Sequence, residues 1–298
     1  MTKFLGNIWG IFIVNLIRFI LCKFSPVRVI TWNINSRTKK QTLKEQCLFL
    51  ENNLDIITLQ EVTLKSQDFF KDFFRDRHIL SSFDLVPDVS ILTGKRKYGQ
   101  LIISNHPIKY LKDRCINIPF SERVLSGIIE NINLEIHTTH VPPGSSNGVI
   151  KVEHFEGFYE YLFNRKENKK IVTGDFNSPK LENPDGTIVT WGQKVNSKGQ
   201  ARIAVNPKWK HQCSGERWDS AERNIIQNHD KLDLKDVFRT VNGYRDNSFS
   251  WFAHNSTGRR YDHIFCSKGI AVKESVYLQS ARESNLSDHT PLFSKIAF

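Results

Sequence analysis

Polar side chains suited to metal binding or to the activation of water follow a short apolar run in the second half of the chain. The run from Ile171 to Thr173 stops at Gly174, and Asp175 and Asn177 come next. An apolar run of this length, bounded by turn residues, predicts a buried strand. Because glycine lets the backbone turn, we expect Asp175 and Asn177 to project from the strand's end towards one spot. A carboxylate near an amide suits a metal-activated water or an anionic substrate, and ordinary turn chemistry is the alternative.

The same pattern, an apolar run that ends in asparagine, aspartate, glutamate or histidine, recurs along the chain. It gives a set of candidate site residues: Asn33, Asn35, Glu61, His140, Asp175, Asn177, Asp262, Asp288 and His289. A single strand end of this kind is compatible with a turn. Its repetition favours a functional role for these residues over ordinary turn chemistry.

The elements that would position these side chains alternate between strands and helices from Pro26 onwards. Apolar residues at helical spacing predict helices over about 43–52, 69–74 and 152–162. Short apolar or β-branched runs predict strands over 27–32, 55–61, 101–103, 128–131, 134–139, 171–173, 247–252, 261–266 and 292–298. No repeat, low-complexity segment or interdomain linker follows residue 26, so we expect one domain over 26–298.

Two segments are predicted to be irregular. The composition of residues 141–148, rich in proline, glycine and serine, argues against regular structure. Residues 181–217 lack clear periodicity, and lysines and arginines alternate there with Trp191 and Trp209. Basic residues beside tryptophan suit a nucleic-acid surface. The alternative is that the tryptophans bury the loop on the core and leave a solvated charged face.

The overall charge of the chain is strongly positive. Its 298 residues include 42 Lys and Arg against 31 Asp and Glu, a formal net charge of +11. This favours a polyanionic partner, either nucleic acid or an anionic membrane surface. Hydrophobic and charged contents of 39% and 24% indicate a globular protein and exclude wholesale disorder. The five cysteines are scattered without a zinc-binding pair, which predicts a reducing, cytoplasmic compartment and no structural disulfides.

Residues 4–24 are mostly apolar and long enough in principle for a membrane span or a signal segment. Asn7, Asn15 and Arg18 interrupt the stretch, and an arginine near the middle of a span costs about 2.5 to 3.5 kcal/mol. Two interpretations of residues 1–25 stay open: weak membrane association, or an extra helix packed on the domain. If the segment does anchor the chain, its flanking basic residues keep the domain in the cytoplasm.

Five motifs, taken together and in order, resemble those of the endonuclease/exonuclease/phosphatase superfamily. They are Trp32-Asn33-Ile34-Asn35, Leu59-Gln60-Glu61, Gly174-Asp175-Phe176-Asn177, Arg260-Tyr261-Asp262 and Ser287-Asp288-His289. Residues 32–36 and 251–262 look most like the exonuclease III type of apurinic/apyrimidinic endonuclease. The resemblance covers about residue 27 to the C-terminus. It implies a four-layer α/β sandwich, with two packed mixed β-sheets flanked by helices and a metal site where strand ends meet.

The resemblance also implies a metal site with named ligands. Glu61 would be the principal Mg²⁺ ligand, helped by Asn33 and Asn35, with Asp288 on the far side of the ion. Hard oxygen ligands without cysteine suit Mg²⁺ or Mn²⁺, and Mg²⁺ binds through few carboxylates while it keeps water and substrate phosphate.

The remaining matched residues would carry the reaction. Asp175 would orient or deprotonate the attacking water, and Asn177 would hold a phosphate oxygen. His289 would contact the scissile phosphate, with Asp262 fixing its tautomer. Trp251 and Arg260, in the endonuclease-like block, are expected to bind substrate.

One position departs from the pattern of these endonucleases. They carry a tyrosine before Val-Pro, where this chain has His140. A histidine can also donate to a phosphate oxygen or protonate a leaving group, so we include His140 among the catalytic candidates.

The sequence thus predicts a Mg²⁺-dependent phosphodiester hydrolase, a DNA endonuclease or exonuclease of the abasic-site repair type. Nucleic acid is the expected partner, and no protein partner is predicted. Two alternatives stay open: a phosphoesterase that acts on a lipid or small phosphoester at a membrane, and an inactive nucleic-acid-binding module. Converging carboxylates argue against the binding module, which has no use for them.

Overall fold

The structure, a computed structural model, describes residues 26–51, 54–205, 209, 211–254 and 256–298. The apolar segment 4–24 and the prediction of membrane association attached to it lie outside these residues. None of the helices in the described part of the chain is long and apolar enough to cross a membrane.

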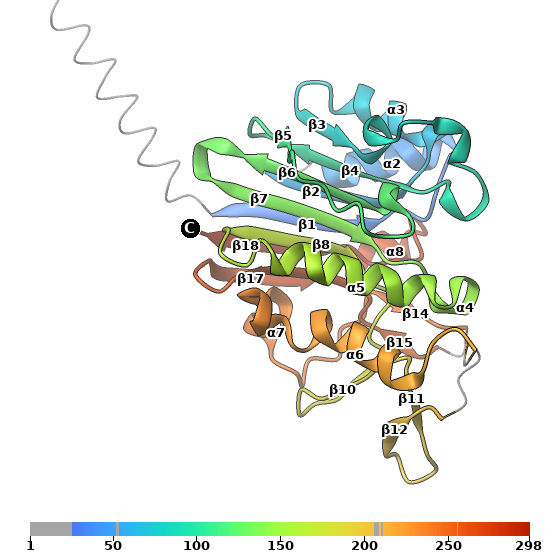
Figure 1. Cartoon of the computed structure of the whole chain (residues 1–298). Helices are drawn as coiled ribbons and strands as arrows, with labels where there is room; N and C mark the ends of the chain where they lie inside the picture. The colour runs from blue at the N-terminus through green and yellow to red at the C-terminus, as the bar shows by residue number, and fades with distance from the viewer. Residues whose placement is uncertain (1–25, 52–53, 206–208, 210, 255) are drawn as a thin grey trace, which may run out of the picture.

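In the described residues, two six-stranded mixed sheets pack face to face (Figure 1). The first has the order β17-β18-β1-β2-β4-β3, with bounds Ala271–Tyr277, Leu292–Ala297, Val27–Asn33, Ile56–Val62, Gly99–Ser104 and His78–Ser81. The second has the order β13-β16-β8-β7-β6-β5, with bounds Leu234–Asp236, Asp262–Ser267, Lys170–Asp175, Leu134–His140, Val124–Ile129 and Lys109–Tyr110. Apolar side chains from both sheets form one buried cluster that joins them, including Val29, Ile56, Ile136, Ile171 and Ile264.

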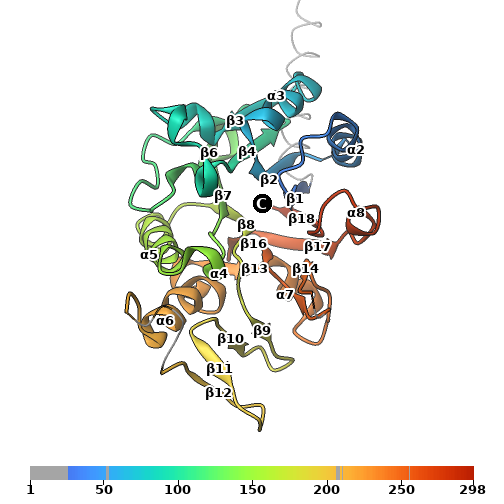
Figure 2. The same ribbon diagram turned by 90° about the vertical axis from the view of Figure 1, so that its right-hand side faces the viewer.

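Helices cover the outer faces of the two sheets (Figure 2). On the first sheet lie α2 and α3, at Lys40–Leu50 and Leu64–Phe73, and on the second lie α5 and α6, at Ile150–Phe163 and Gly215–Ile226. Shorter helices are α4 (Gly144–Asn147), α7 (Val237–Asn242) and α8 (Ser280–Glu283). The predicted four-layer α/β sandwich is confirmed. The predicted division at residue 25 stays a prediction.

Most predicted strands are present, but the local predictions for residues 141–148 and 247–252 were wrong. Residues 141–148 contain α4, which begins after Pro143 and ends at Gly148, where φ is +59°. Proline before a helix and glycine after it are helix boundary signals, and here they delimit a single turn. The predicted strand over 247–252 shrinks to β14, Trp251–Phe252, paired with β15, Gly258–Arg259. Strand β17 and helices α6 to α8 were not anticipated.

The segment predicted to be irregular over 181–217 is built of two small hairpins followed by α6 (Figure 1). Strands β9 and β10, Leu181–Glu182 and Ile188–Val189, form the first, and β11 and β12, Gln193–Val195 and Ala201–Ile203, form the second. Both turns contain a glycine with positive φ, Gly186 and Gly199. Strands of two or three residues are too short to leave a periodic signal.

Gly174 is needed for a reason other than the predicted turn. Strand β8 continues through it to Asp175, and Gly174 pairs with Thr139 of the parallel strand β7. A Cβ at Gly174 would lie 1.9 Å from the carbonyl oxygen of Thr139, and its φ is +138°. The close approach of the two backbones therefore requires glycine. It also places His140 and Asp175 side by side in the next register position.

Candidate active site

The predicted site residues converge at the ends of strands from both sheets. Asn33 ends β1 and Glu61 lies near the end of β2, in the first sheet. In the second sheet, Asp175 at the end of β8 pairs with His140 on one side and with Asp262 on the other. The site thus sits between the sheets, at the edge where these strands end.

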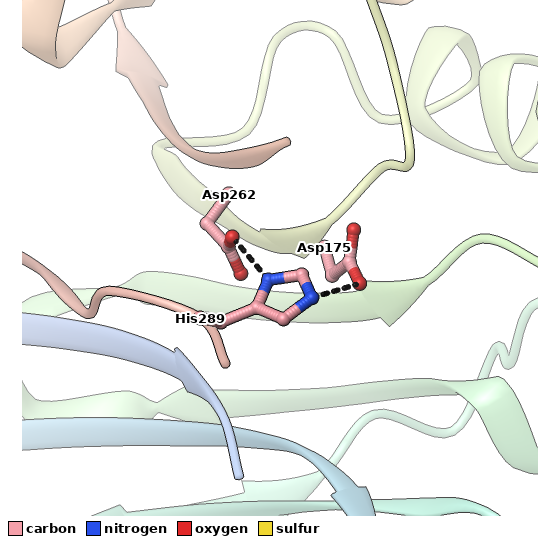
Figure 3. Close-up of side chains that lie close together, drawn as sticks. All are labelled: Asp175, Asp262 and His289. Atoms are coloured by element: carbon pink, nitrogen blue, oxygen red, sulfur yellow. Dashed lines mark hydrogen bonds and ion pairs between the residues drawn. The ribbon is translucent and has the colours of Figure 1, made fainter. Parts of the chain in front are cut away.

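His289 lies between two carboxylates (Figure 3). Its Nδ1 is 2.7 Å from Oδ2 of Asp262, and its Nε2 is 3.8 Å from Oδ2 of Asp175. Burial alone would lower the pKa of His289, but the charges of Asp262 and Asp175 outweigh burial and raise it. The ring is therefore protonated at neutral pH, with Nδ1 donating to Asp262 and Nε2 directed into the site.

The backbone around His289 is also fixed. Its carbonyl oxygen accepts a hydrogen bond from Nε1 of Trp32 at 3.0 Å. Its N–H donates to Oγ of Ser287 at 3.1 Å, and that hydroxyl in turn donates to the carbonyl oxygen of Asn33 at 2.7 Å. Such contacts hold the imidazole before any substrate arrives, which reduces the reorganisation that the reaction requires.

Asp175 is buried and held by two donors. Its Oδ2 accepts from Nδ2 of Asn33 at 2.9 Å, and its Oδ1 accepts from the backbone N–H of Asn177 at 2.8 Å. Burial raises the pKa of Asp175, whereas the charge of His289 lowers it and that of Asp262 adds to the rise. A carboxylate with a raised pKa is better suited to accept a proton near neutral pH.

Glu61 approaches the same spot from the first sheet. Nδ2 of Asn33 lies 3.3 Å from its Oε1. Its φ is +55°, and the pairing of β2 with β4 is irregular between Leu59 and Val62, so the backbone departs from a regular strand at this carboxylate. Burial raises the pKa of Glu61, and the charge of His289 and the hydrogen bond from Asn33 oppose that rise. A bound cation would stabilise this buried carboxylate in its charged form.

The donor atoms present fit a divalent cation that prefers oxygen. Ligand atoms of Asp175, Asp262 and His289 lie within 4.8 Å of one another. Because Nδ1 of His289 is engaged by Asp262, the carboxylates and the amide oxygens are the better ligands. Oδ1 of Asp262 is buried and has no hydrogen-bond partner among the described residues, which leaves it free to accept a water or an ion. Glu61 and Asn33 complete a set of hard donors.

Other predicted residues lie at the rim of this cluster. Asp288 is exposed, and its Oδ2 is 3.4 Å from Nε1 of Trp251. Trp251 stacks on Tyr261, with ring centroids 5.3 Å apart. Nδ2 of Asn177 donates to the carbonyl oxygen of Val141 at 2.9 Å. Asn35, with φ of +53°, donates its N–H to Oδ1 of Asn33 at 2.9 Å.

His140 is buried within the cluster. Its Nε2 lies 3.6 Å from Oε1 of Glu61 and 3.7 Å from Oδ2 of Asp175, too far for direct hydrogen bonds. Burial lowers the pKa of His140 well below its usual range, and the charges of Arg123 and His289 act in the same direction. His140 is thus a neutral imidazole that can donate or accept one proton at each ring nitrogen according to its tautomer.

Arg260 is the predicted site residue that the structure places away from this cluster. It is 3% exposed, and its guanidinium is bound to Glu182 and Asp236, with its Nη2 2.6 Å from Oδ2 of Asp236. The preceding residue, Arg259, is only partly buried and faces the cavity beside Trp251. The two neighbouring arginines therefore differ completely in their surroundings.

Arg123 is a residue that the sequence analysis missed. It is 1% exposed, and its guanidinium lies 5.1 Å from the ring centroid of Tyr98, which itself contacts His140. Nε and Nη1 have no hydrogen-bond partner among the described residues. Its position in a short turn, Ser121–Arg123, carries no periodic signal, and nothing in the sequence marks it for the site.

Comparisons with known proteins agree with this geometry. The sequence profile of the Endonuclease/Exonuclease/phosphatase family matches residues 30–289. No curated protein matches the chain significantly by sequence.

Solved structures share the fold. An AP endonuclease from Archaeoglobus fulgidus is 19% identical, with a TM-score of 0.63 over 90% of this chain and 98% of that chain. A 3′ phosphatase from Neisseria bound to a product DNA hairpin is 20% identical, with a TM-score of 0.62 over 91% and 100%. A humanized TDP2 from D. rerio is 13% identical, with a TM-score of 0.60 over 92% and 99%.

The profile match covers most of the chain and includes every strand end that contributes to the site. At these identities the solved structures show the fold alone, and it is the sandwich expected from the sequence. Family members are nucleases and phosphatases that hydrolyse phosphate esters and generally require a divalent metal. The chain therefore belongs to the endonuclease/exonuclease/phosphatase family of hydrolases.

Proposed function

We propose that this protein is a Mg²⁺- or Mn²⁺-dependent phosphodiester hydrolase that acts on DNA, at abasic sites or at strand ends. The observation that carries the proposal is the position of His289 between Asp262 and Asp175, with Asn33 joining Asp175 to Glu61. A buried imidazolium, a buried carboxylate of raised pKa and a set of oxygen donors are the groups that phosphodiester hydrolysis requires.

His289 and Asp175 have complementary roles in this proposal. His289, protonated and held through Nδ1 by Asp262, donates from Nε2 to an oxygen of the scissile phosphate. Asp175 accepts a proton from the attacking water, while Asn33 and Asn177 keep its carboxylate in place. A positioned acid or base of this kind contributes about 10²- to 10⁴-fold to the rate.

The phosphate itself is held by the remaining polar groups. In this proposal, the amide N–H of Asn177 and the imidazole of His140 contact its oxygens or the leaving group. A divalent cation held by Glu61, with Asn33, Asn35 and Asp288 as further ligands, would neutralise charge that develops on the phosphate. Trp251 binds substrate at the rim, and in this proposal Arg259 takes the place of Arg260 as the substrate-binding arginine.

DNA is favoured as substrate by the charge of the chain. The formal net charge is +11, which favours association with a polyanion. Two of the structurally similar proteins are described as an AP endonuclease and as a phosphatase bound to a DNA hairpin. A cytoplasmic location and membrane association through residues 4–24 stay predictions.

The experiment is cleavage of three substrates by the purified full-length chain with Mg²⁺, and with chelator as control. The substrates are an abasic-site duplex, an undamaged duplex with a recessed 3′ end, and a phosphoinositide in mixed vesicles. We expect chelator-sensitive cleavage of DNA that Asp175→Asn abolishes. Turnover of the phosphoinositide alone would overturn DNA as the substrate, and no turnover of any of the three would overturn the proposal as a whole.

A further inference from the structure

A pocket of about 500 Å³ adjoins the active site and is not used by the chemistry described above. Asn177 and Tyr261 line it, and in the chain they are neighbours of Asp175 and Asp262. Trp251 lines it too, with its ring centroid 6.5 Å from that of His289. A group bound in the pocket would therefore be attached close to the phosphate undergoing hydrolysis.

Aromatic side chains form much of the wall. They are Trp191, Trp209, Trp218, Trp251 and Tyr261. Trp251 stacks on Tyr261, with the two rings inclined by only 22°. Trp191 is held by a hydrogen bond from its Nε1 to the carbonyl oxygen of Asn177 at 3.2 Å. Flat, braced aromatic faces bind planar rings by stacking, the interaction by which proteins hold unpaired nucleobases.

The pocket also carries uncompensated positive charge. Lys151 is neutralised by Glu222, with its Nζ 2.7 Å from Oε1. Lys180, Lys194 and Arg259 line the same pocket, and none of the three has a carboxylate within ion-pair distance among the described residues. An anion is therefore the expected companion of whatever ring occupies the pocket.

Arg259 is a positively charged residue of the pocket that also contacts two of its tryptophan rings. Its guanidinium lies 4.9 Å from the ring centroid of Trp191 and 5.8 Å from that of Trp251. Burial and the charge of Arg259 lower the pKa of Lys180, as expected where like charges are crowded. A bound phosphate would relieve this repulsion while the tryptophans contact the attached ring.

We infer that this pocket binds a base-bearing nucleotide next to the scissile phosphate, with the base against Trp191 and Trp251 and a phosphate at Arg259, Lys180 and Lys194. The inference rests on the proposed function and narrows its two proposed targets, abasic sites or strand ends, to the second. A sugar phosphate without a base has no ring to stack, and an abasic residue would leave most of the volume unfilled. The substrate class is therefore a nucleic acid whose nucleotide is unpaired beside the cleavage point.

The wall of the pocket shares its support with the catalytic strand end. Nζ of Lys151 donates to the carbonyl oxygen of Asn177 at 2.8 Å. Its partner Glu222 accepts from Oγ of Ser178 at 2.7 Å and from the backbone N–H of Trp191 at 3.0 Å. One buried ion pair thus fixes both Asn177 and Trp191, which links the place of the base to that of the phosphate.

The test measures binding of thymidine 3′,5′-bisphosphate to the full-length chain in the presence of chelator. Quenching of tryptophan fluorescence reports the binding. Chelator keeps hydrolysis out of the measurement. We expect saturable quenching by the nucleotide, with deoxyribose 5-phosphate and inorganic phosphate binding at least 10-fold more weakly. Equal affinity for the three would overturn the inference, because the ring would then contribute nothing.

Substitution of two exposed lysines tests where the phosphate of the nucleotide binds. Lys194 lines the pocket, and Lys198 lies in the turn of the same hairpin outside it. We expect Lys194→Ala to weaken nucleotide binding at least 3-fold and Lys198→Ala to leave it unchanged, with both variants fully folded. Arg259→Ala should weaken it at least 10-fold. Equal behaviour of the two lysine variants would overturn the placement of the phosphate.

Substrate cleavage separates this inference from the proposed function. With Mg²⁺, we expect single-stranded DNA with a base on each nucleotide to be cleaved with a lower KM than the same strand with an abasic residue beside the cleavage point. Arg259→Ala should raise the KM for the first substrate to that for the second. Cleavage of both substrates with equal KM would overturn the inference that the pocket binds a base and would leave the proposed function intact. No cleavage of either substrate would count against the proposed function.

Discussion

Nδ1 of His289 and Oδ2 of Asp262 are 2.7 Å apart, although the two residues are 27 positions apart in the sequence. His289 lies in the loop before β18, and Asp262 is the first residue of β16. Both side chains are buried, with exposed fractions of 8% for His289 and 0% for Asp262. The pair therefore exists because two strands of different sheets bring their ends together, and its charge separation is little screened by water.

Asp262→Asn tests this pair. Asparagine keeps a similar shape but no charge, so the pKa of His289 should fall and the ring should lose its proton near neutral pH. We expect turnover at pH 7.5 to fall about 10²- to 10⁴-fold, measured on the DNA substrate that the wild type cleaves best. Turnover is expected to fall because the pKa of His289 is raised in the wild type. The protonated ring is present below that pKa and is lost as the pH rises through it.

The same variant should show its remaining activity at lower pH than the wild type. His289→Ala is the matched control, and the double variant should be no worse than His289→Ala alone because both changes act on one group. A turnover within 3-fold of wild type in Asp262→Asn would contradict the role assigned to the pair.

Glu61→Gln tests the metal site. The carboxylate lies 3.3 Å from Nδ2 of Asn33 and is the charged donor that β2 contributes, so its loss should weaken Mn²⁺ binding at least ~10-fold. Calorimetry with Mn²⁺ measures this directly, and the Mg²⁺ concentration that gives half-maximal turnover should rise in parallel. Glu283→Gln, an exposed glutamate in α8, is the control. Unchanged Mn²⁺ affinity in Glu61→Gln would place the ion elsewhere.

Much of this site could be predicted from the sequence because its residues follow buried strands. Asn33, Glu61, His140 and Asp175 each end or nearly end an apolar run, and such runs are visible without knowledge of the tertiary fold. Their convergence was inferred from the family resemblance. The structure supplies the registers, such as His140 beside Asp175, that no local pattern contains.

The features that the sequence analysis missed depend on tertiary contacts, which local sequence patterns do not contain. Arg123 contacts the site from a three-residue turn, and its burial is set by Tyr98 and Phe120, which lie in other segments. Strand β17 was missed because it is an edge strand in which charged and apolar residues mix, with five of its seven residues exposed or partly exposed to solvent. The tryptophans of the pocket come from two turns, from helix α6 and from the two-residue strand β14, none of which leaves a periodic signal that would group them.

Gly174→Ala tests the close approach of β7 and β8. The added Cβ would lie 1.9 Å from the carbonyl oxygen of Thr139, a backbone atom that cannot move aside, and φ of +138° is itself unfavourable for alanine. We expect a loss of at least ~3 kcal/mol in the free energy of unfolding, measured by urea denaturation. Gly269→Ala, where no atom lies within 4 Å of the new Cβ, should change stability by less than about 1 kcal/mol.

A variant Gly174→Ala that unfolds at the same urea concentration as the wild type would contradict the pairing of Thr139 with Gly174. If the variant is too unstable to purify, the thermal midpoint in cell lysate gives the same comparison. Because His140 and Asp175 occupy the next register position, turnover should fall with stability in this variant and remain at the wild-type level in Gly269→Ala.

The neighbouring residues Arg259 and Arg260 should separate stability from substrate binding. Arg260 is 3% exposed and neutralises two buried carboxylates, with its Nε 2.9 Å from Glu182 and its Nη2 2.6 Å from Asp236. Arg260→Met would leave those carboxylates without this partner, a loss that typically costs about 3 to 5 kcal/mol. Arg259→Ala removes a partly exposed side chain and should change the free energy of unfolding by less than ~1 kcal/mol while it raises the KM for DNA.

The pH dependence of stability distinguishes the two variants further. Burial alone would raise the pKa of Glu182, but Arg260 and Arg239 lower it to about 2. A carboxyl with a lowered pKa stabilises the fold above its usual pKa and loses that contribution as the pH falls towards 2. The stability gap between wild type and Arg260→Met should therefore narrow as the pH falls from about 4.5 towards 2, whereas Arg259→Ala should follow the wild type throughout. A KM effect in Arg260→Met without loss of stability would instead return Arg260 to the substrate site.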